Sequence, residues 1–350
     1  MPPFTPKNNN KKVIVFGSSG AIGTSLVGIL SEKQPAWEIT AVARSAADKF
    51  DDLKNVTVVP GDATDKSSVM KLCKGQDLVF CCIGFPKYET KYWAETWPVV
   101  VDNLLAGSSQ GPEQKFVFCD NLYAYGAKTD IKPTDEPVEA NLETKPGVRA
   151  VLREKLQARM KSHPQSISVV GGADFFGPGV TDLGFLGDTF TKPIVKTIYT
   201  AKKGTPLAMG SASKIHDFCY VPDFANALYL AGTEYKASGK FWICPHSIHN
   251  KTMTEIAADI AQFAGAGASD KLIKKAKKVQ VLGPTIVKIL GFFMSFMREM
   301  KDMMPIWLND YSVDDSDFCK TFGVEATPYD EALQGYITFY KSELDKQNNK

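Results

Sequence analysis

The sequence predicts an α/β fold in which a parallel, doubly wound sheet carries a smaller lobe from the C-terminal part of the chain. Short, continuous apolar runs recur along the first half of the sequence, and stretches of helical periodicity separate most of them. A glycine-rich turn follows the first apolar run directly, at residues 17–23. Alternation of strands and helices produces a parallel sheet with helices on both faces.

The apolar runs are too short for helices and suit strands that are buried on both faces. The predicted strands are residues 13–16, 39–43, 56–59, 78–83, 116–118 and 167–170. The predicted helices between them include residues 24–30, 67–72 and 99–106. After about residue 179 the chain becomes irregular and rich in glycine and proline, and a strand–helix pattern returns at residues 218–231.

The turn at residues 17–23 has glycines at positions 17, 20 and 23, between a predicted strand and a predicted helix. Such glycines let the backbone turn tightly and approach a pyrophosphate, while the helix N-terminus supplies N–H donors. A plain strand-to-helix turn is the alternative. We interpret the turn as the nicotinamide dinucleotide site of a Rossmann fold. The residues assigned to it are Gly17, Ser19, Gly20, Ala21, Ile22 and Gly23.

Residues after the second and third predicted strands indicate which dinucleotide is bound. Arg44 stands where an acidic residue would hold the 2′-hydroxyl of NAD, whereas an arginine can pair with the 2′-phosphate of NADP. Arg44 and Ser45 therefore favour NADP, with NAD as the alternative cofactor and a solvated arginine as the alternative role. Asp62 and Ala63 stand where an adenine ring would lie, and a simple Asp/Gly turn is the alternative.

Several motifs occur in an order that is typical of one family. They are the turn at residues 17–23, Asp62, Cys82-Ile83-Gly84, Tyr125-Gly126, residues 176–179 and residues 216–223. With these motifs the sequence resembles the extended short-chain dehydrogenases/reductases, the NAD-dependent epimerase/dehydratase family. The resemblance implies a nicotinamide-dependent enzyme whose cofactor site includes Cys82, Ile83, Gly84 and Phe175.

The catalytic pair of that family is missing. The resemblance implies a Tyr-x-x-x-Lys pair after the fifth strand, in which the lysine cation lowers the pKa of the tyrosine. The corresponding residues here are Lys145 and Arg149, and an arginine cannot deliver a proton. We predict that Arg149 bonds a ribose.

Two residues near the end of the fifth predicted strand are candidates to replace the missing chemistry. Asn121 falls where the family has serine or threonine, and we predict that it orients a substrate carbonyl. Tyr123 is the predicted proton donor, with Lys145 as the second candidate. If this loop is extended, residues 121 and 123 point to the same side. Packing of Tyr123 and Tyr125 against the sheet edge is the alternative.

Two positions bear on the substrate. Asp174 takes a place where the family often has asparagine near the nicotinamide, and a turn cap is the alternative. His216 replaces the arginine that meets a sugar-nucleotide phosphate in the family's nucleotide-sugar enzymes, although Lys214 stands nearby. The loss of this arginine argues against a nucleotide-sugar substrate.

Two clusters have a simple interpretation and a functional one. Cys244, His246 and His249 have ligand types that zinc uses, but no acidic residue or further cysteine stands nearby in the sequence, so we expect no metal site. The lysines of residues 271–278 favour a solvated helix face. Residues 286–304 are amphipathic and too interrupted to span a bilayer. We interpret them as a lid over an apolar substrate, with an interfacial helix as the alternative.

These observations divide the chain into two parts and a tail. We expect residues 11–180 to form an NAD(P)-binding Rossmann domain, to which residues 216–235 return. Residues 181–215 and 236–345 are predicted to form a substrate-binding lobe, and residues 1–10 a flexible tail. No internal repeat interrupts this division.

The predicted function is that of an NADP(H)-dependent oxidoreductase or isomerase acting on a small, fairly apolar carbonyl compound. The alternatives are a non-catalytic NADP(H)-binding sensor or scaffold, and a nucleotide-sugar epimerase or dehydratase. The charge is nearly balanced, with 41 basic and 39 acidic residues among 350, which argues against a nucleic-acid partner. The N-terminus lacks the apolar stretch of a signal peptide, so we expect a cytoplasmic protein, with a homodimer left open.

Overall fold

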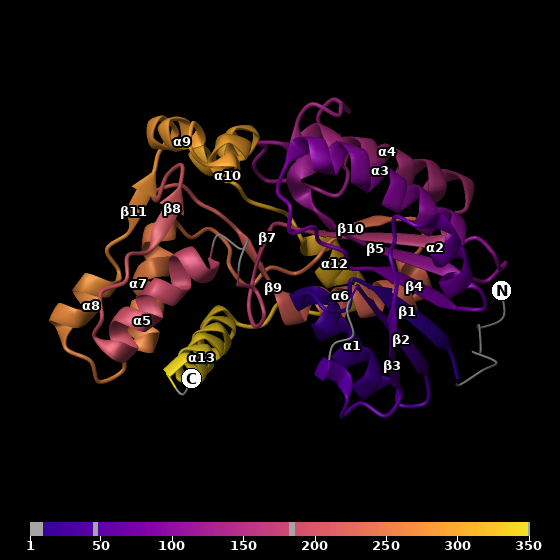
Figure 1. Cartoon of the computed structure of the whole chain (residues 1–350), viewed down its shortest axis with the longest axis horizontal. Coiled ribbons are helices and arrows are strands. Elements are labelled where there is room, and N and C mark those ends of the chain that lie inside the picture. The colour runs from indigo at the N-terminus through magenta and orange to yellow at the C-terminus, as the bar shows by residue number, and fades with distance from the viewer. Residues whose placement is uncertain (1–9, 45–47, 182–185, 349–350) are drawn as a thin grey trace.

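The computed structural model describes residues 10–44, 48–181 and 186–348. Its centre is a seven-stranded sheet in the order β10–β6–β5–β4–β1–β2–β3, and every pairing in it is parallel. The predicted parallel, doubly wound sheet is therefore confirmed (Figure 1). Its strands are β1 (Lys12–Phe16), β2 (Glu38–Ala43), β3 (Val56–Pro60), β4 (Leu78–Cys81), β5 (Lys115–Asn121), β6 (Ile167–Gly172) and β10 (Phe241–Ile243).

Strand β1 shows why the short apolar runs become central strands. Val13 and Val15 belong to one buried cluster, whereas Ile14 and Phe16 belong to the other. Successive side chains of a strand point to opposite faces of the sheet, so a run without polar residues buries both faces. The hydrophobic effect thus fixes these strands in the interior.

Helices cover both faces of the sheet (Figure 1). The helices α1 (Ala21–Lys33) and α6 (Val221–Thr233) pack against each other on one face. The helices α2 (Lys66–Cys73), α3 (Thr90–Gly107) and α4 (Lys145–Ser162) form a continuous layer on the other. The order of the strands reverses between β1 and β4, and the carboxyl ends of strands at such a point are where open α/β sheets bind ligands.

Two segments differ from the sequence-based expectation. Helix α3 begins at Thr90 and contains Pro98, whereas the sequence predicted a helix only over residues 99–106. Strand β10 lies within residues 236–345, which we assigned to the lobe, yet it pairs with β6 and completes the sheet. The helix α12 (Ser316–Phe322) packs on β10 through ring contacts with Trp242. The indole of Trp242 is fully buried in these contacts, and its burial holds β10 and α12 together at the edge of the sheet.

The remaining C-terminal elements form a second, smaller body beside the sheet (Figure 1). They are α5 (Lys192–Thr200), α7 (Met253–Ala264), α8 (Asp270–Ala276), α13 (Tyr329–Asn348), β8 (Leu207–Met209) and β11 (Gln280–Leu282). The short strands β7 (Asp174–Phe176) and β9 (Phe218–Tyr220) pair where this lobe joins the sheet. One buried cluster includes Phe118 of the sheet and Ile194 of the lobe, so the two parts share a core.

Residues 286–304 do not form one amphipathic helix. The chain breaks here into α9 (Pro284–Gly291), α10 (Ser295–Glu299) and the 3₁₀ turn η6 (Met300–Asp302), before α11 (Met304–Leu308). Among the described residues, no helix is long and apolar enough to cross a membrane. Other 3₁₀ turns are η1 (Asp48–Phe50), η2 (Leu122–Tyr125), η3 (Pro164–Ser166) and η5 (Tyr235–Ala237), whereas η4 (Gly187–Thr191) is a short π-helix.

Candidate functional site

The glycine-rich turn between β1 and α1 has a backbone that requires glycine at two positions. Gly17 has a φ of +79°, and a Cβ there would lie 2.6 Å from the carbonyl carbon of Cys82. A Cβ on Gly23 would meet the carbonyl oxygen of Gly17. Gly20 caps α1, which begins at Ala21, so unpaired N–H groups of the first helical turn lie beside the turn. The turn thus has the close backbone packing that a bound pyrophosphate needs.

The neighbouring strand β2 holds this turn in place. The N–H groups of Gly17 and Ser18 both donate to the carbonyl oxygen of Val42, at 3.2 Å. Arg44 follows β2 and is exposed, while Ser45 lies outside the described residues. The ammonium of Lys49 donates to the carbonyl oxygen of Ser19 at 2.9 Å, a second cation at the turn that sequence reasoning missed. Nothing in the sequence around Lys49 marks it as different from a surface lysine.

Asp62 and Ala63 form a turn at the end of β3. One carboxylate oxygen of Asp62 accepts hydrogen bonds from the N–H and the hydroxyl of Thr64, each at 2.8 Å. These bonds form an Asp turn in which Asp62 stays exposed. The carbonyl oxygen of Ala63 accepts from the side chain of Asn103 on α3 at 3.0 Å. These bonds fix the turn beside the end of β2.

Residues after β4 and β6 lie at the same edge of the sheet. The N–H of Cys82 donates to the carbonyl oxygen of Phe16 at 2.8 Å, so the segment that continues to Ile83 and Gly84 starts against the end of β1. Phe175, in β7, packs edge to face on Phe224 with ring centroids 4.9 Å apart. The structure therefore gathers the predicted cofactor residues that it describes around the ends of neighbouring strands.

Arg149 lies on α4 and is almost fully buried. Its guanidinium forms an ion pair with Asp120, near the end of β5, and lies 4.7 Å from the ring centroid of Trp97. A buried guanidinium needs such a carboxylate partner, because an unpaired charge in the interior is costly. The charge that we predicted for a ribose is thus neutralised by Asp120. Sequence reasoning missed this aspartate, which ends an apolar run.

Asn121 and Tyr123 lie at the carboxyl end of β5, but the loop between them is not extended. The side-chain oxygen of Asn121 accepts from the N–H of Tyr123 at 3.2 Å and caps the 3₁₀ turn η2. An asparagine at such a position competes for the backbone and bends it, which explains the difference. Tyr123 points into the protein and is buried.

Tyr123 begins a buried chain of polar contacts. Its hydroxyl donates to Asp174 at 2.8 Å, and the second carboxylate oxygen of Asp174 lies 2.8 Å from Nε2 of His216. Burial, reinforced by the negative charge of Asp174, holds the pKa of Tyr123 well above its ordinary value of 10. The phenol is therefore protonated at neutral pH. The chain joins a proton donor through a carboxylate to an imidazole.

Aromatic rings surround this chain. The imidazole of His216 stacks on Trp307, with ring centroids 3.9 Å apart, and on Tyr311 at 5.0 Å. Within the described part of the chain, the buried hydroxyls of Tyr88 and Tyr311 have no hydrogen-bond partner. Buried hydroxyls without partners are costly and mark places where a polar group of a ligand can bind. Sequence reasoning missed Tyr88, Trp307 and Tyr311, because no motif contains them.

Lys145 occupies the position of the family's missing tyrosine. Its side chain is fully buried, and the ammonium contacts the Glu299 carboxylate at 2.6 Å and the hydroxyl of Thr90 at 3.0 Å. The ammonium also lies 4.6 Å from the ring centroid of Tyr88. Although partial burial opposes it, the contact with Lys145 lowers the pKa of Glu299. Lys145 therefore forms an ion pair with Glu299 of α10, a helix that is distant from Lys145 in the sequence.

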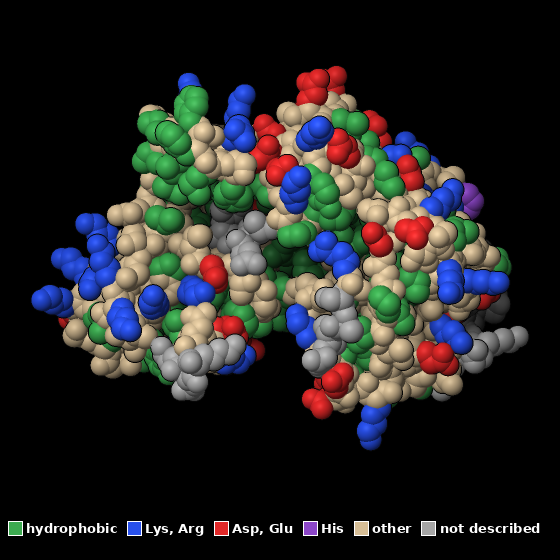
Figure 2. Space-filling model, viewed as in Figure 1, with side chains coloured by type: hydrophobic (Ala, Val, Ile, Leu, Met, Phe, Trp, Pro, Cys, Tyr) green, Lys and Arg blue, Asp and Glu red, His purple; other side chains and the backbone are tan. Residues whose placement is uncertain are grey.

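A hollow separates the lobe from the edge of the sheet (Figure 2). Hydrophobic side chains are visible on its floor (Figure 2). Glu299 and Phe296 of α10 contact Lys145 and Tyr88 of the sheet half, so α10 packs on the candidate site. The part of residues 286–304 that lies against the site is therefore α10 with the following turn η6, and not α9.

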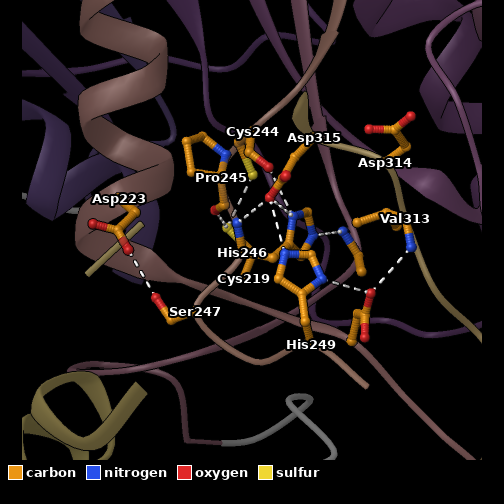
Figure 3. A network of polar contacts seen from close by, with 12 residues as sticks. Cys219, Asp223, Cys244, Pro245, His246, Ser247, His249, Val313, Asp314 and Asp315 are labelled. Atoms are coloured by element: carbon orange, nitrogen blue, oxygen red, sulfur yellow. Dashed lines mark hydrogen bonds and ion pairs between the residues drawn. The ribbon is translucent and has the colours of Figure 1, made fainter. Parts of the chain in front are cut away.

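Cys244, His246 and His249 belong to a separate network (Figure 3). Nδ1 of His246 donates to the carbonyl oxygen of Cys244 at 2.7 Å, and Nε2 accepts from the N–H of Ala173 at 3.0 Å. Together with Cys219, whose Sγ lies 3.0 Å from that of Cys244, His246 offers ligand atoms within 4.8 Å. Both nitrogens of His246 already have partners, so a metal would have to displace the bond to Ala173.

His249 in the same network carries a proton. Its two ring nitrogens face Asp217 at 2.9 Å and Asp315 at 3.1 Å (Figure 3). Partial burial opposes the charge, but the two carboxylates outweigh it and raise the pKa of His249 to about 10. An imidazolium cannot ligate a metal, and here it joins two acidic segments of the chain. Asp315 is the acidic neighbour that the local sequence did not reveal.

Comparisons with known proteins agree with this fold. A model of the NAD-dependent epimerase/dehydratase family matches residues 13–244. The dTDP-glucose 4,6-dehydratase of Bacillus anthracis, solved in complex with NAD, is 15% identical, with 96% of this chain and 98% of that chain covered and a TM-score of 0.72. No curated protein sequence matches the chain.

Other solved structures share the fold. The UDP-glucuronic acid 4-epimerase of Bacillus cereus, in complex with NAD, is 16% identical over 95% of this chain and 99% of that chain, with a TM-score of 0.70. A GDP-L-fucose synthetase of Naegleria fowleri is 13% identical over 97% and 94%, with a TM-score of 0.68. At such identities these structures establish the likeness of the fold.

Proposed function

The chain belongs to the NAD-dependent epimerase/dehydratase family, and on that basis we propose that it is an NADP(H)-dependent oxidoreductase with a rearranged proton-transfer site. The observation that carries the proposal is the buried chain from the Tyr123 hydroxyl through Asp174 to His216. These contacts supply a protonated phenol at the edge of the sheet, in a protein that lacks the family's Tyr-x-x-x-Lys pair. The substrate is a small, fairly apolar carbonyl compound.

The choice of NADP rests on cations near the glycine-rich turn. Arg44 is exposed at the end of β2, and Lys49 is bonded to the carbonyl oxygen of Ser19 within the turn. A 2′-phosphate is a dianion at neutral pH, and an arginine can bind it with two parallel hydrogen bonds. NAD offers only a hydroxyl at this position, so these cations favour NADP over NAD.

The cofactor supplies or accepts the hydride, and the residues of this chain handle the proton. When a carbonyl is reduced, its oxygen becomes an alkoxide and must receive a proton. The phenol of Tyr123, which burial and the charge of Asp174 keep protonated, donates that proton. Asp174 connects the tyrosine to His216, whose imidazole forms the far end of this hydrogen-bonded path.

The substrate class follows from the rings around this chain. Tyr88, Trp307 and Tyr311 present apolar faces, and the free hydroxyls of the two tyrosines offer a few hydrogen bonds. His216 stands where the family's nucleotide-sugar enzymes usually have an arginine. Its imidazole is already bonded to Asp174. These contacts favour a compact carbonyl compound over a nucleotide sugar.

The test is the Tyr123→Phe variant, assayed against a panel of aldehydes and ketones with NADPH consumption as the readout. We expect turnover to fall by about 10²–10⁴-fold, because the general acid is lost. The affinity for NADPH, measured by fluorescence titration, should not change. Tyr125→Phe is the matched control, because its hydroxyl contacts Arg153 and not Asp174.

Each outcome separates the proposal from its alternatives. Full activity of Tyr123→Phe would remove Tyr123 as the donor. Binding of NADPH without turnover of any carbonyl compound would favour a non-catalytic sensor or scaffold. Turnover of nucleotide sugars alone would favour an epimerase or dehydratase of that class.

A further inference from the structure

The tip of the lobe exposes large apolar side chains. Phe292 and Phe293, in the turn between α9 and α10, are 75% and 86% exposed, and Ile289 of α9 is 55% exposed. Ile286, Met294 and Val281 are also exposed. Solvent-exposed phenylalanines in a contiguous segment cost free energy in water, because apolar surface stays hydrated. Contiguous apolar patches of this kind mark binding surfaces.

Helix α9 is apolar on both of its sides. Val287 is buried against the lobe, whereas Ile286 and Ile289 face outward on the same helix. A helix that only covered a core would carry polar residues on its outer face. The outward isoleucines are three residues apart, so they lie on one face and continue into Phe292 and Phe293. This outer face has no partner within the described part of the chain.

The chain around the tip carries only positive charge. Residues 271–298 contain seven basic residues and no acidic residue. The seven are Lys271, Lys274, Lys275, Lys277, Lys278, Lys288 and Arg298, and all are exposed. None of them forms an ion pair with another described residue. The whole protein is nearly neutral, with a formal charge of +2, so this segment concentrates charge on one edge.

The apolar tip and the cations lie along the same side of the molecule. Helix α8, strand β11 and helix α9 follow one another along the outer edge of the lobe, away from the sheet (Figure 1). Figure 2 shows hydrophobic side chains gathered over α9 and Lys and Arg side chains over α8. A flat, negatively charged surface that touches this edge would meet both groups at once.

We propose that this edge of the lobe binds the surface of an anionic lipid bilayer. The side chains of Phe292 and Phe293 enter the boundary between headgroups and acyl chains, and the lysines of α8 contact lipid phosphates. Combined insertion of apolar side chains and attraction of basic ones is how peripheral proteins bind reversibly to membranes. The absence of a spanning helix among the described residues is consistent with binding at the surface.

This proposal replaces the lid that we expected for the first part of residues 286–304. A lid would turn its apolar residues toward the substrate, but those of α9 and the following turn face solvent. The neighbouring α10 does pack on the candidate site through Glu299. The segment is thus divided between a membrane-facing tip and a site-facing helix.

Co-sedimentation of the full chain with vesicles tests the proposal. We expect the protein to bind vesicles of phosphatidylcholine mixed with phosphatidylglycerol, and to bind pure phosphatidylcholine much less. Binding should weaken as the salt concentration rises, because salt screens exposed charges. The variant Phe292→Ser/Phe293→Ser should lower the partition coefficient by at least about tenfold, since two apolar insertions are lost.

Matched variants distinguish binding of vesicles by this edge from nonspecific binding by other exposed side chains. Tyr235→Ser/Leu142→Ser removes two exposed apolar side chains elsewhere and should leave binding unchanged. Replacing four lysines of the edge by glutamine should lower binding by at least about tenfold. Those four are Lys274, Lys275, Lys277 and Lys278. Substitution of four exposed lysines in or next to α2, α3 and α4 should have little effect, and they are Lys71→Gln, Lys74→Gln, Lys91→Gln and Lys161→Gln.

Two results would overturn the proposal. The first is a wild-type protein that does not bind anionic vesicles, or binds them equally well without Phe292 and Phe293. The second is a change of oligomeric state in the Phe292→Ser/Phe293→Ser variant, measured by sedimentation velocity, which would make the edge an interface between copies of the chain. Unchanged NADPH affinity in every variant shows that the fold is intact.

Discussion

At one end of the candidate site, consecutive residues between β1 and α1 form the glycine-rich turn, and its backbone does the packing. At the other end, Tyr88, Tyr123, Asp174 and His216 come from separate segments and meet only through the fold. The first end depends on the absence of side chains, and the second on the position of buried ones. The glycine-rich turn can therefore be recognised from its own residues. The contacts at the second end cannot, because no continuous segment of the sequence contains the residues that make them.

The largest expected effect concerns the turn. Gly23→Ala places a Cβ against the carbonyl oxygen of Gly17, and neither backbone can move without displacing β1 or α1. We expect the free energy of unfolding to fall by at least about 3 kcal/mol, at the upper end of overpacking effects, and NADPH binding to be lost. Urea unfolding and fluorescence titration measure the two effects.

The same helix provides the control. Gly28→Ala, also in α1, adds a Cβ that has open space around it. It should leave NADPH binding unchanged and stabilise the protein by about 0.5–1 kcal/mol, because alanine favours a helix over glycine. If both variants behaved alike, the turn would not be the strict local element that we describe.

The second effect concerns the opposite end. Glu299→Gln leaves the fully buried ammonium of Lys145 without its carboxylate. Breaking a fully buried ion pair lowers the free energy of unfolding by about 3–5 kcal/mol. We expect about 2–3 kcal/mol here, because the side chain of Glu299 is 22% exposed. Chemical unfolding of the variant checks this value.

A surface pair of the same charges is the control for Glu299. Asp102→Asn breaks the exposed pair with Lys155, and its cost should stay below about 1 kcal/mol. Equal costs for the two variants would show that Lys145 is not held by the lobe in the way that the structure indicates.

The third effect tests whether the first end selects the cofactor. Arg44→Gln removes the charge that we assign to the 2′-phosphate. NADPH binding should weaken about tenfold, at the low end for charged hydrogen bonds because Arg44 is exposed, while NADH binding stays the same. Fluorescence titration of both nucleotides measures the change, and an equal loss for NADH would contradict the assignment.

The last effect is a pH dependence at His249, in the separate polar network. The folded-state pKa of His249 is raised to about 10, from about 6.5 in an unfolded chain. The protonated form therefore stabilises the fold fully below pH 6.5, and this contribution declines as pH rises toward 10. The melting temperature of His249→Gln should approach that of the wild type over this range.

The control for His249 is an exposed histidine. His163→Gln, on the surface after α4, should not change the pH profile of the melting temperature. A difference between wild type and His249→Gln that stays constant from pH 6.5 to 10 would show that the two carboxylates do not hold a proton on this imidazole.

The sequence could predict what depends on neighbours along the chain. The apolar runs became six of the seven central strands, because a strand buried on both faces requires only its own residues to be apolar. The family was also correct, since its motifs are short and ordered. Strand β10 was missed although its three residues are apolar, because its place depends on pairing with the distant β6 and on Trp242 being covered by α12.

Only the tertiary structure decided the partners of the buried charges and hydroxyls. Arg149 was predicted to meet a ribose, yet Asp120 lies against it, and Lys145 is paired with a glutamate that is 154 positions away. A buried charge must find a counter-charge, but the sequence does not say which one, because chain segments that are distant in sequence supply it. The backbone turn was therefore determined by the sequence itself, and the site that we propose for proton transfer by packing.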